Sequence, residues 1–214
     1  MIGAASPAHS VLQELKAATS TVHARVESAL PSLSALGDRA SYFACLEALH
    51  GFYATWEPTV WRALASENSS LCADERRKVP ALRRDLGRLQ AELGVELVDR
   101  VAPTPVIASV GTALGVLYVF EGATLGGRVV ERNVSQRLRL TAHDGLSFFH
   151  GYGERTGEMW GLFGRELTRW AALYGRTDEI VSGAVMCFLS LEQWLLTSDP
   201  RARASRIEHV ADRA

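Results

Sequence analysis

The sequence has few cysteines and no long hydrophobic run. These two features argue against a disulfide-rich protein and against a membrane-spanning one. Its cysteines, Cys45, Cys72 and Cys187, lie far apart and form no CxxC pair. This spacing is typical of reduced thiols in a cytoplasmic protein rather than of a disulfide framework, and we expect Cys45 and Cys187 to be core residues. The uncharged apolar stretch of residues 105–120 is shorter than the ~20 residues that a membrane-spanning helix needs, and it is followed by Glu121.

The chain also has no excess of charge of one sign, and we expect no targeting segment. The net charge is −1 and the charged fraction is 22%, so composition indicates neither nucleic acid nor a membrane surface as a partner. The N-terminal stretch MIGAASPAHSVLQELK has no basic region followed by an apolar one, which predicts no signal peptide. We therefore expect a soluble, cytoplasmic protein.

Motifs of several common catalytic sites are missing as well. The sequence contains no HExxH, no paired ExxH, no glycine-rich phosphate loop and no GxSxG elbow, which leaves single residues on helices as candidates. His50, near Tyr53 and Trp56, is expected to be a packed core histidine rather than a ligand. A basic cluster is expected to form a solvated face, or a docking site for an acidic protein: Arg76, Arg77, Lys78, Arg83, Arg84 and Arg88.

What the sequence does have is helical periodicity along almost its whole length, with 47% hydrophobic residues. The predicted helices cover residues 12–30, 38–65, 79–93, 104–139, 154–174 and 177–196, and no alternating strand pattern is present. Asp38 is the expected N-cap of the second helix, which Pro58 should kink or divide. Residues 143–153 are expected to form a loop. We predict an all-α protein with one helical domain over residues 1–199 and a polar, disordered tail over residues 200–214.

The first predicted helix contains a candidate haem site. Lys16 and His23 are seven residues apart, so they share one helix face with about 10 Å between them along the axis. That spacing suits a haem whose iron binds the histidine and whose propionate meets the lysine. Glu27, one turn on, is placed to orient the other imidazole nitrogen. The alternative, a partly buried histidine beside an exposed lysine and glutamate, stays open at this point.

The helix predicted over residues 104–139 carries an unusual number of glycines. Gly111, Gly115, Gly122 and Gly126 are spaced along one face, although each glycine costs roughly 1 kcal/mol of helix stability relative to alanine. Close packing of two helices explains Gly111 and Gly115. It explains Gly122, Gly126 and the adjacent Gly127 less well, whereas a flat macrocycle lying on the bare backbone accounts for all three.

Three blocks of the sequence resemble the haem oxygenase family. LKAATSTVHARVE is similar to the family's opening helix with its proximal histidine, EGATLGGRV resembles the glycine motif of the distal helix, and GLSFF resembles the aromatic segment after it. The blocks come in the family's order over most of the chain. The form YVxEGxTLGG is most similar to the bacterial branch associated with bacteriophytochromes, which use biliverdin as chromophore.

This resemblance implies a fold, an activity and a set of residues. The fold is all-α, with haem between a proximal and a distal helix. The activity is oxidation of haem, both cofactor and substrate, to biliverdin with release of iron and carbon monoxide, using dioxygen and electrons from a ferredoxin or a reductase. The resemblance makes His23 the axial iron ligand and Gly122 and Gly126 the positions against the distal haem face, with Gly127 beside them. Lys16 and Arg165 become the propionate partners.

Two positions depart from the family pattern. Ala123 stands where many members have an aspartate that orders proton-delivering waters, and Gly161 stands where some have a second propionate-binding lysine. Glu121 and Thr124 are polar neighbours of Ala123, but helix geometry points them about 100° to either side. Two other functions therefore remain in view: a haem-binding carrier or sensor without turnover, and a helical interaction module in which the glycines serve only packing.

Overall fold

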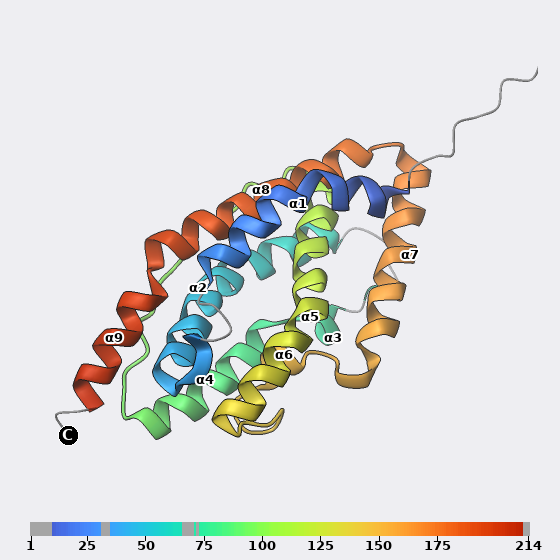
Figure 1. Cartoon of the computed structure of the whole chain (residues 1–214). Helices are drawn as coiled ribbons and strands as arrows, with labels where there is room; N and C mark the ends of the chain where they lie inside the picture. The colour runs from blue at the N-terminus through green and yellow to red at the C-terminus, as the bar shows by residue number, and fades with distance from the viewer. Residues whose placement is uncertain (1–9, 31–34, 66–70, 72, 212–214) are drawn as a thin grey trace, which may run out of the picture.

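The computed structural model describes residues 10–30, 35–65, 71 and 73–211, and within these ranges the protein is built from helices (Figure 1). The α-helices are α1 (Val11–Ala29), α2 (Arg39–Leu64), α3 (Ala73–Arg76), α4 (Val79–Leu93), α5 (Val110–Leu138), α6 (Ser147–His150), α7 (Thr156–Tyr174), α8 (Thr177–Ser198) and α9 (Pro200–Ala211), with short 3₁₀ turns η1 (Ala35–Gly37) and η2 (Gly153–Arg155). Over the described residues, extended pairing is limited to isolated bridges from Thr141 to Asp144 and Gly145. The predicted all-α fold is confirmed.

Glycines let α5 and α8 approach closely. A Cβ atom at Gly115 would overlap the carbonyl oxygen of Ile180, and one at Gly183 would overlap that of Thr112. A Cβ atom at Gly111 would lie 2.7 Å from Glu179, so this interface has no room for side chains at these positions. The expectation that Gly111 and Gly115 serve helix packing is confirmed.

The second helix is central to the core and runs without a break. Asp38 caps it by accepting a hydrogen bond from the Ser41 N–H, as predicted. The expectation that Pro58 divides the helix is wrong, because α2 continues to Leu64. Pro58 lies on the exposed side, while Trp56 and Val60 on either side of it are buried and hold both halves in the core.

Two other boundaries differ from the sequence prediction. The long glycine helix begins at Val110, not near Thr104, because the hydroxyl of Ser109 caps it by accepting from the Thr112 N–H. The segment expected to be a loop contains the short helix α6, whose first N–H groups, from Ser147 and Phe148, donate to the carboxylate of Asp85. A buried carboxylate that satisfies free N–H groups at a helix start stabilises even a single turn.

The expectation of a disordered tail is wrong for residues 200–211, which form α9 against α2 (Figure 1). Ala204 and Ile207 are three residues apart and both are buried, at 5% and 1% exposure. Arg203 donates to the buried carboxylate of Glu47 at 2.8 and 3.2 Å. With Pro200, which is also buried, these apolar side chains and the ion pair dock a segment whose overall composition is polar.

Two helical stretches, Val110–Leu138 and Thr177–His209, are long and apolar enough to cross a membrane by length and composition alone. In each, about half of the apolar window is buried inside the protein, at 56% and 44%. Core helices of soluble proteins share these properties, and here the apolar faces of α5 and α8 are used against each other. The predicted burial of Cys45 and Cys187 is confirmed, whereas Cys72 lies outside the described residues.

Candidate functional site

The first helix presents both of its predicted site residues to the surface. Its inner side is anchored by the buried residues Leu15 and Val26, so Lys16 and His23 are exposed. The His23 side chain is 56% exposed, and its Nε2 atom lies 3.6 Å from a carboxylate oxygen of Glu27. That distance is too long for a hydrogen bond, so this imidazole can still bind a metal through a ring nitrogen.

Contacts with α8 fix the orientation of the His23 helix. The His23 ring packs against Phe188 with 5.3 Å between ring centroids. Two residues further along α1, Arg25 forms an ion pair with Glu192 at 2.6 Å. Phe188 and Glu192 are one turn apart on α8, so the two contacts hold α1 against α8 at the imidazole and just after it.

The glycines of α5 beyond the α8 interface have very different surroundings. A Cβ atom at Gly122 or at Gly126 would meet nothing within 4 Å. One at Gly127 would lie 3.3 Å from the carbonyl oxygen of Phe149. The structure therefore places Gly122 and Gly126 together on an open face of α5, and places Gly127 against the α6 segment instead.

Tyr118 is a site candidate that sequence reasoning missed. It lies one turn before Gly122 on the open face, its ring is 5.8 Å from that of Trp160 on α7, and its hydroxyl contacts Thr19 on α1. Burial raises the pKa of this phenol, and the hydrogen bond with Thr19 opposes the shift. The spacing of four residues from Gly122 was a sequence signal that could have identified it.

Arg165 is exposed on α7 and lines a groove between α7 and α1. The groove has a volume of about 530 Å³, and Leu12 of α1 closes one side of it. Gly161 lies beside the guanidinium, since a Cβ atom there would be 3.6 Å from Arg165 Nη1. Lys16, one turn after Leu12, and Arg165 thus belong to neighbouring helices that are in contact.

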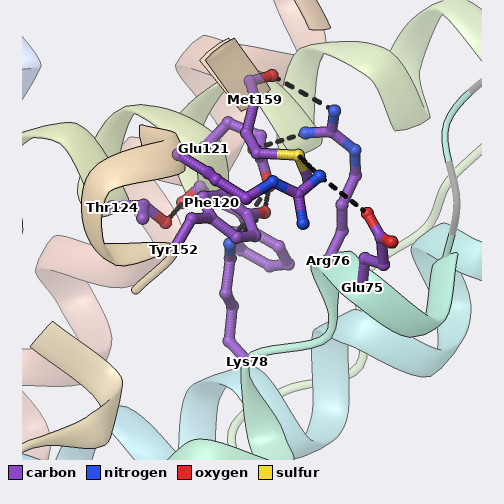
Figure 2. A network of polar contacts seen from close by, with 9 residues as sticks. Glu75, Arg76, Lys78, Phe120, Glu121, Thr124, Tyr152 and Met159 are labelled. Atoms are coloured by element: carbon purple, nitrogen blue, oxygen red, sulfur yellow. Dashed lines mark hydrogen bonds and ion pairs between the residues drawn. The ribbon is translucent and has the colours of Figure 1, made fainter. Parts of the chain in front are cut away.

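The polar neighbours of Ala123 point away from this face, as helix geometry predicts. Glu121 is 2% exposed and binds Arg76 and Lys78, and the Thr124 hydroxyl donates to the Phe120 carbonyl (Figure 2). The expectation that the whole basic cluster is solvated is therefore wrong for Arg76 and Lys78, which are 2% and 7% exposed. Their partner, the Glu121 carboxylate, is distant in sequence, so the run of basic residues alone could not predict these ion pairs.

His50 stays apart from the site, as expected. It is 8% exposed and its Nε2 atom accepts a hydrogen bond from Arg83 at 3.4 Å. A packed and hydrogen-bonded histidine is what the sequence predicted for this position.

The residues present fit a haem better than a bare metal ion. Over the described residues, no group of three or more His, Cys, Asp or Glu side chains is placed to hold an ion, whereas haem iron needs only one protein ligand such as a histidine. Open space over Gly122 and Gly126 leaves the α5 backbone accessible to a flat ring. Lys16 and Arg165 suit the carboxylates of such a ligand.

Comparison with known proteins agrees with this geometry. The family model described as Heme oxygenase matches residues 9–197. A protein named Heme oxygenase from Xanthomonas campestris pv. campestris (strain 8004) is 44% identical over 68 residues, which cover 32% of this chain and 38% of that relative. The alignment therefore spans well under half of the relative's length.

Solved structures of similar fold carry the same family name. The NO- and CO-bound haem oxygenase from Neisseria meningitidis superposes with a TM-score of 0.76 at 21% identity, covering 89% of this chain and 92% of that one. The haem oxygenase of Leptospira interrogans gives a TM-score of 0.66 at 18% identity, with coverages of 88% and 100%. Haem oxygenase 2 of Chlamydomonas reinhardtii, solved without haem, gives 0.67 at 16% identity, with coverages of 87% and 96%. At these identities the likeness is one of fold.

Proposed function

This chain belongs to the haem oxygenase family, and from that premise we propose that it oxidises haem to biliverdin with release of iron and carbon monoxide. One observation carries the proposal at the level of the site: an exposed His23 on α1 accompanies two α5 glycines, Gly122 and Gly126, that have no packing partner. A glycine pair with nothing against it weakens a helix without improving the fold. A flat ligand that lies on the open face explains why the helix has glycines there despite the loss of helix stability.

The chain's own residues would bind and orient the substrate. His23 supplies the nitrogen ligand, and Phe188 together with the Arg25–Glu192 pair holds its helix in place. Lys16 and Arg165 bind the propionates and thereby select the rotational setting of the ring. Bound haem supplies the iron at which dioxygen is activated, and it is itself the molecule oxidised.

Proton delivery would depend on water. Ala123 is exposed and has no acidic group, and Glu121 and Thr124 are buried on other sides of α5. A bridging water is enthalpically nearly as good as a direct hydrogen bond, and immobilising it costs at most about 2 kcal/mol. Waters on the backbone between Gly122 and Gly126 would serve in place of the aspartate of other family members.

The second candidate function is a haem carrier or sensor of the same fold without turnover, and Ala123 is the observation that favours it. For the enzyme, we propose the cytoplasm as its compartment and a ferredoxin or a reductase as the electron donor. An acidic ferredoxin would dock on the remaining basic residues of α4, Arg83, Arg84 and Arg88. The further proposed partner is a bacteriophytochrome that takes up the biliverdin.

Reconstitution with haemin tests these functions. We expect a Soret band that decays to a biliverdin spectrum when a reductant and dioxygen are added. His23→Ala should lose the ferrous histidine signature and turnover, with partial rescue by imidazole, whereas His50→Ala should retain both. A stable Soret band without biliverdin would favour the carrier, and no Soret band would favour a helical interaction module.

A further inference from the structure

A buried polar cluster is centred on Glu121 of α5, the residue before Gly122 (Figure 2). The Glu121 carboxylate is 2.5 Å from Arg76 Nη1 and 3.1 Å from Lys78 Nζ, and it accepts a hydrogen bond from the Tyr152 hydroxyl at 2.7 Å. Lys78 donates in turn to the Tyr152 oxygen at 2.7 Å. Arg76 Nη2 also donates to the Met159 carbonyl at 3.1 Å. The Glu121 carboxylate therefore joins α5 to the end of α3, to Lys78 and to the α6–α7 connection, and Arg76 extends the link to the start of α7.

The charges in this cluster are closely matched. Glu57, 2% exposed, accepts hydrogen bonds from the backbone N–H groups of Lys78 and Val79, and it faces the cluster from α2. Burial lowers the pKa of the Lys78 ammonium, and the charge of Glu121 opposes that shift. Burial and the Glu121 charge both raise the pKa of Tyr152 above its ordinary range.

Stability alone does not explain such a cluster. Removing two cations and a carboxylate from water is costly, and well-packed apolar residues often serve at least as well. Here the cost is not fully offset, because Arg76 Nε is buried with no hydrogen-bond partner in the described part of the chain. Buried ion pairs do have a second use, which is to fix one arrangement of the elements they join.

The element that needs fixing is the glycine segment of α5. Gly122, Gly126 and Gly127 weaken the helix, and nothing in the protein packs over the bare backbone at Gly122 and Gly126. Several contacts hold the segment on its other sides. There Phe149 lies against Gly127, the Thr124 methyl group fits where Gly151 has no Cβ, and Arg128 donates to the Gly153 carbonyl at 2.6 Å. Glu121 begins this line of contacts, one residue before Gly122.

We propose that Glu121 is a positioning residue for the haem reaction: its contacts with Arg76, Lys78 and Tyr152 hold the glycine segment of α5 in one place and so set the position of the open face. This inference deepens the proposed function and rests on it. Glu121 acts through the backbone of its neighbours and does not itself reach the substrate side.

The first test uses the haem-free protein, so it does not depend on the proposed function. Hydrogen exchange of the amides at residues 118–130 should accelerate at least about tenfold in Glu121→Gln, as loss of a charged hydrogen bond predicts. Tyr152→Phe, which removes only a hydroxyl, should give a smaller change of the same sign and remains informative if Glu121→Gln fails to fold. Glu47→Gln is the matched control, because Glu47 is also buried, at 4% exposure, and also pairs with an arginine, Arg203. It should accelerate exchange in α9 and leave residues 118–130 unchanged.

The second test separates positioning from a general loss of stability. In the haem-loaded ferrous protein, the C–O stretching band of added carbon monoxide reports the glycine side, and the iron–histidine band reports the His23 side. We expect Glu121→Gln to shift or broaden the C–O band and to leave the iron–histidine band unchanged. Glu47→Gln should change neither band, even where it lowers the stability of the protein by the same amount. Unchanged exchange at residues 118–130 together with a native C–O band in both cluster variants would overturn the inference. Failure of native protein to form biliverdin would overturn the proposed function instead.

Discussion

Gly115 and Gly126 lie on the same helix, but an added side chain would meet opposite surroundings at the two positions. At Gly115 it would overlap the backbone of α8, and at Gly126 it would meet nothing within 4 Å. Gly126→Leu should therefore keep or raise the melting temperature, because leucine favours a helix over glycine by about 1 kcal/mol. The same variant should lose haemin binding, since the side chain fills the space over the backbone.

Gly115→Leu is the matched control for this residue-scale prediction. Overpacking against a backbone carbonyl should cost about 3 kcal/mol of unfolding free energy. Thermal unfolding and haemin titration of both variants are the measurements. Native-like haemin affinity in Gly126→Leu would show that the open face is not the haem site.

His50 predicts how the stability of the protein depends on pH. Burial lowers the pKa of this imidazole, Arg83 lowers it further, and Asp99 opposes the shift. As the pH falls through about 6.5, the unfolded chain therefore binds a proton that the folded protein does not bind. The unfolding free energy should fall over that range by at most about 1.4 kcal/mol per pH unit from this group.

Urea unfolding between pH 7.5 and 5.5 measures this effect. His50→Gln retains an acceptor for Arg83 and has no titrating ring, so its pH dependence should be flatter than that of the native protein. His143 is exposed, and His143→Gln should leave the slope unchanged. An identical slope in His50→Gln and native protein would contradict the assignment.

Individual residues differ in how far sequence alone could place them. Spacing along single helices, together with the family resemblance, predicts His23, Gly122 and Gly126 as site residues. In the structure His23 is exposed and the two glycines have nothing packed against them. The Glu121 cluster could not be predicted this way, since its partners Arg76 and Tyr152 are 45 and 31 positions away in the chain. A local sequence pattern does not predict which distant cation will pair with a buried carboxylate.

At the scale of elements, α9 shows where composition misleads. Its exposed residues are mostly polar, and only three of its described side chains, Pro200, Ala204 and Ile207, are buried. Helical periodicity over one or two turns is too short to stand out from a polar background. The helix is stabilised by tertiary contact with α2, which is the usual source of stability for short helices.

Ile207→Asp should therefore detach α9 without disturbing the site. Replacing a buried side chain at 1% exposure by a carboxylate should cost about 2–4 kcal/mol. Ser205→Asp places the same charge on the exposed side of α9 and should change stability little. Denaturant unfolding gives both values, and the haemin affinity of each variant should stay native, because α9 packs on α2 and away from α1 and α7. Weakened haemin binding in Ile207→Asp alone would mean that α9 supports the site after all.

At the scale of the whole molecule, the candidate site combines residues from three helices that are far apart in sequence. His23 and Lys16 come from α1, Gly122 and Gly126 from α5, and Arg165 from α7. The all-α class and most helix boundaries followed from periodicity. Periodicity did not predict which helices pack together. The packing of α5 on α8 depends on glycines of both helices, such as Gly115 and Gly183, and their role is recognised only when the two helices are seen in contact. The resemblance to haem oxygenases, not the periodicity, supplied the arrangement.

A ligand that bridges α1, α5 and α7 should stabilise the whole fold. Haemin that binds the folded protein and not the unfolded chain adds about 2.7 kcal/mol at a free concentration of one hundred times its Kd. For a chain of this size each kcal/mol raises the melting temperature by roughly 2–4 °C, so saturating haemin should raise it by about 5–10 °C. Gly126→Leu should show little of this shift, and His23→Ala should show a reduced one that added imidazole partly restores. An equal shift in the double variant His23→Ala/Gly126→Leu would mean that haemin binds elsewhere on the surface, since neither the iron ligand nor the open face would then be needed.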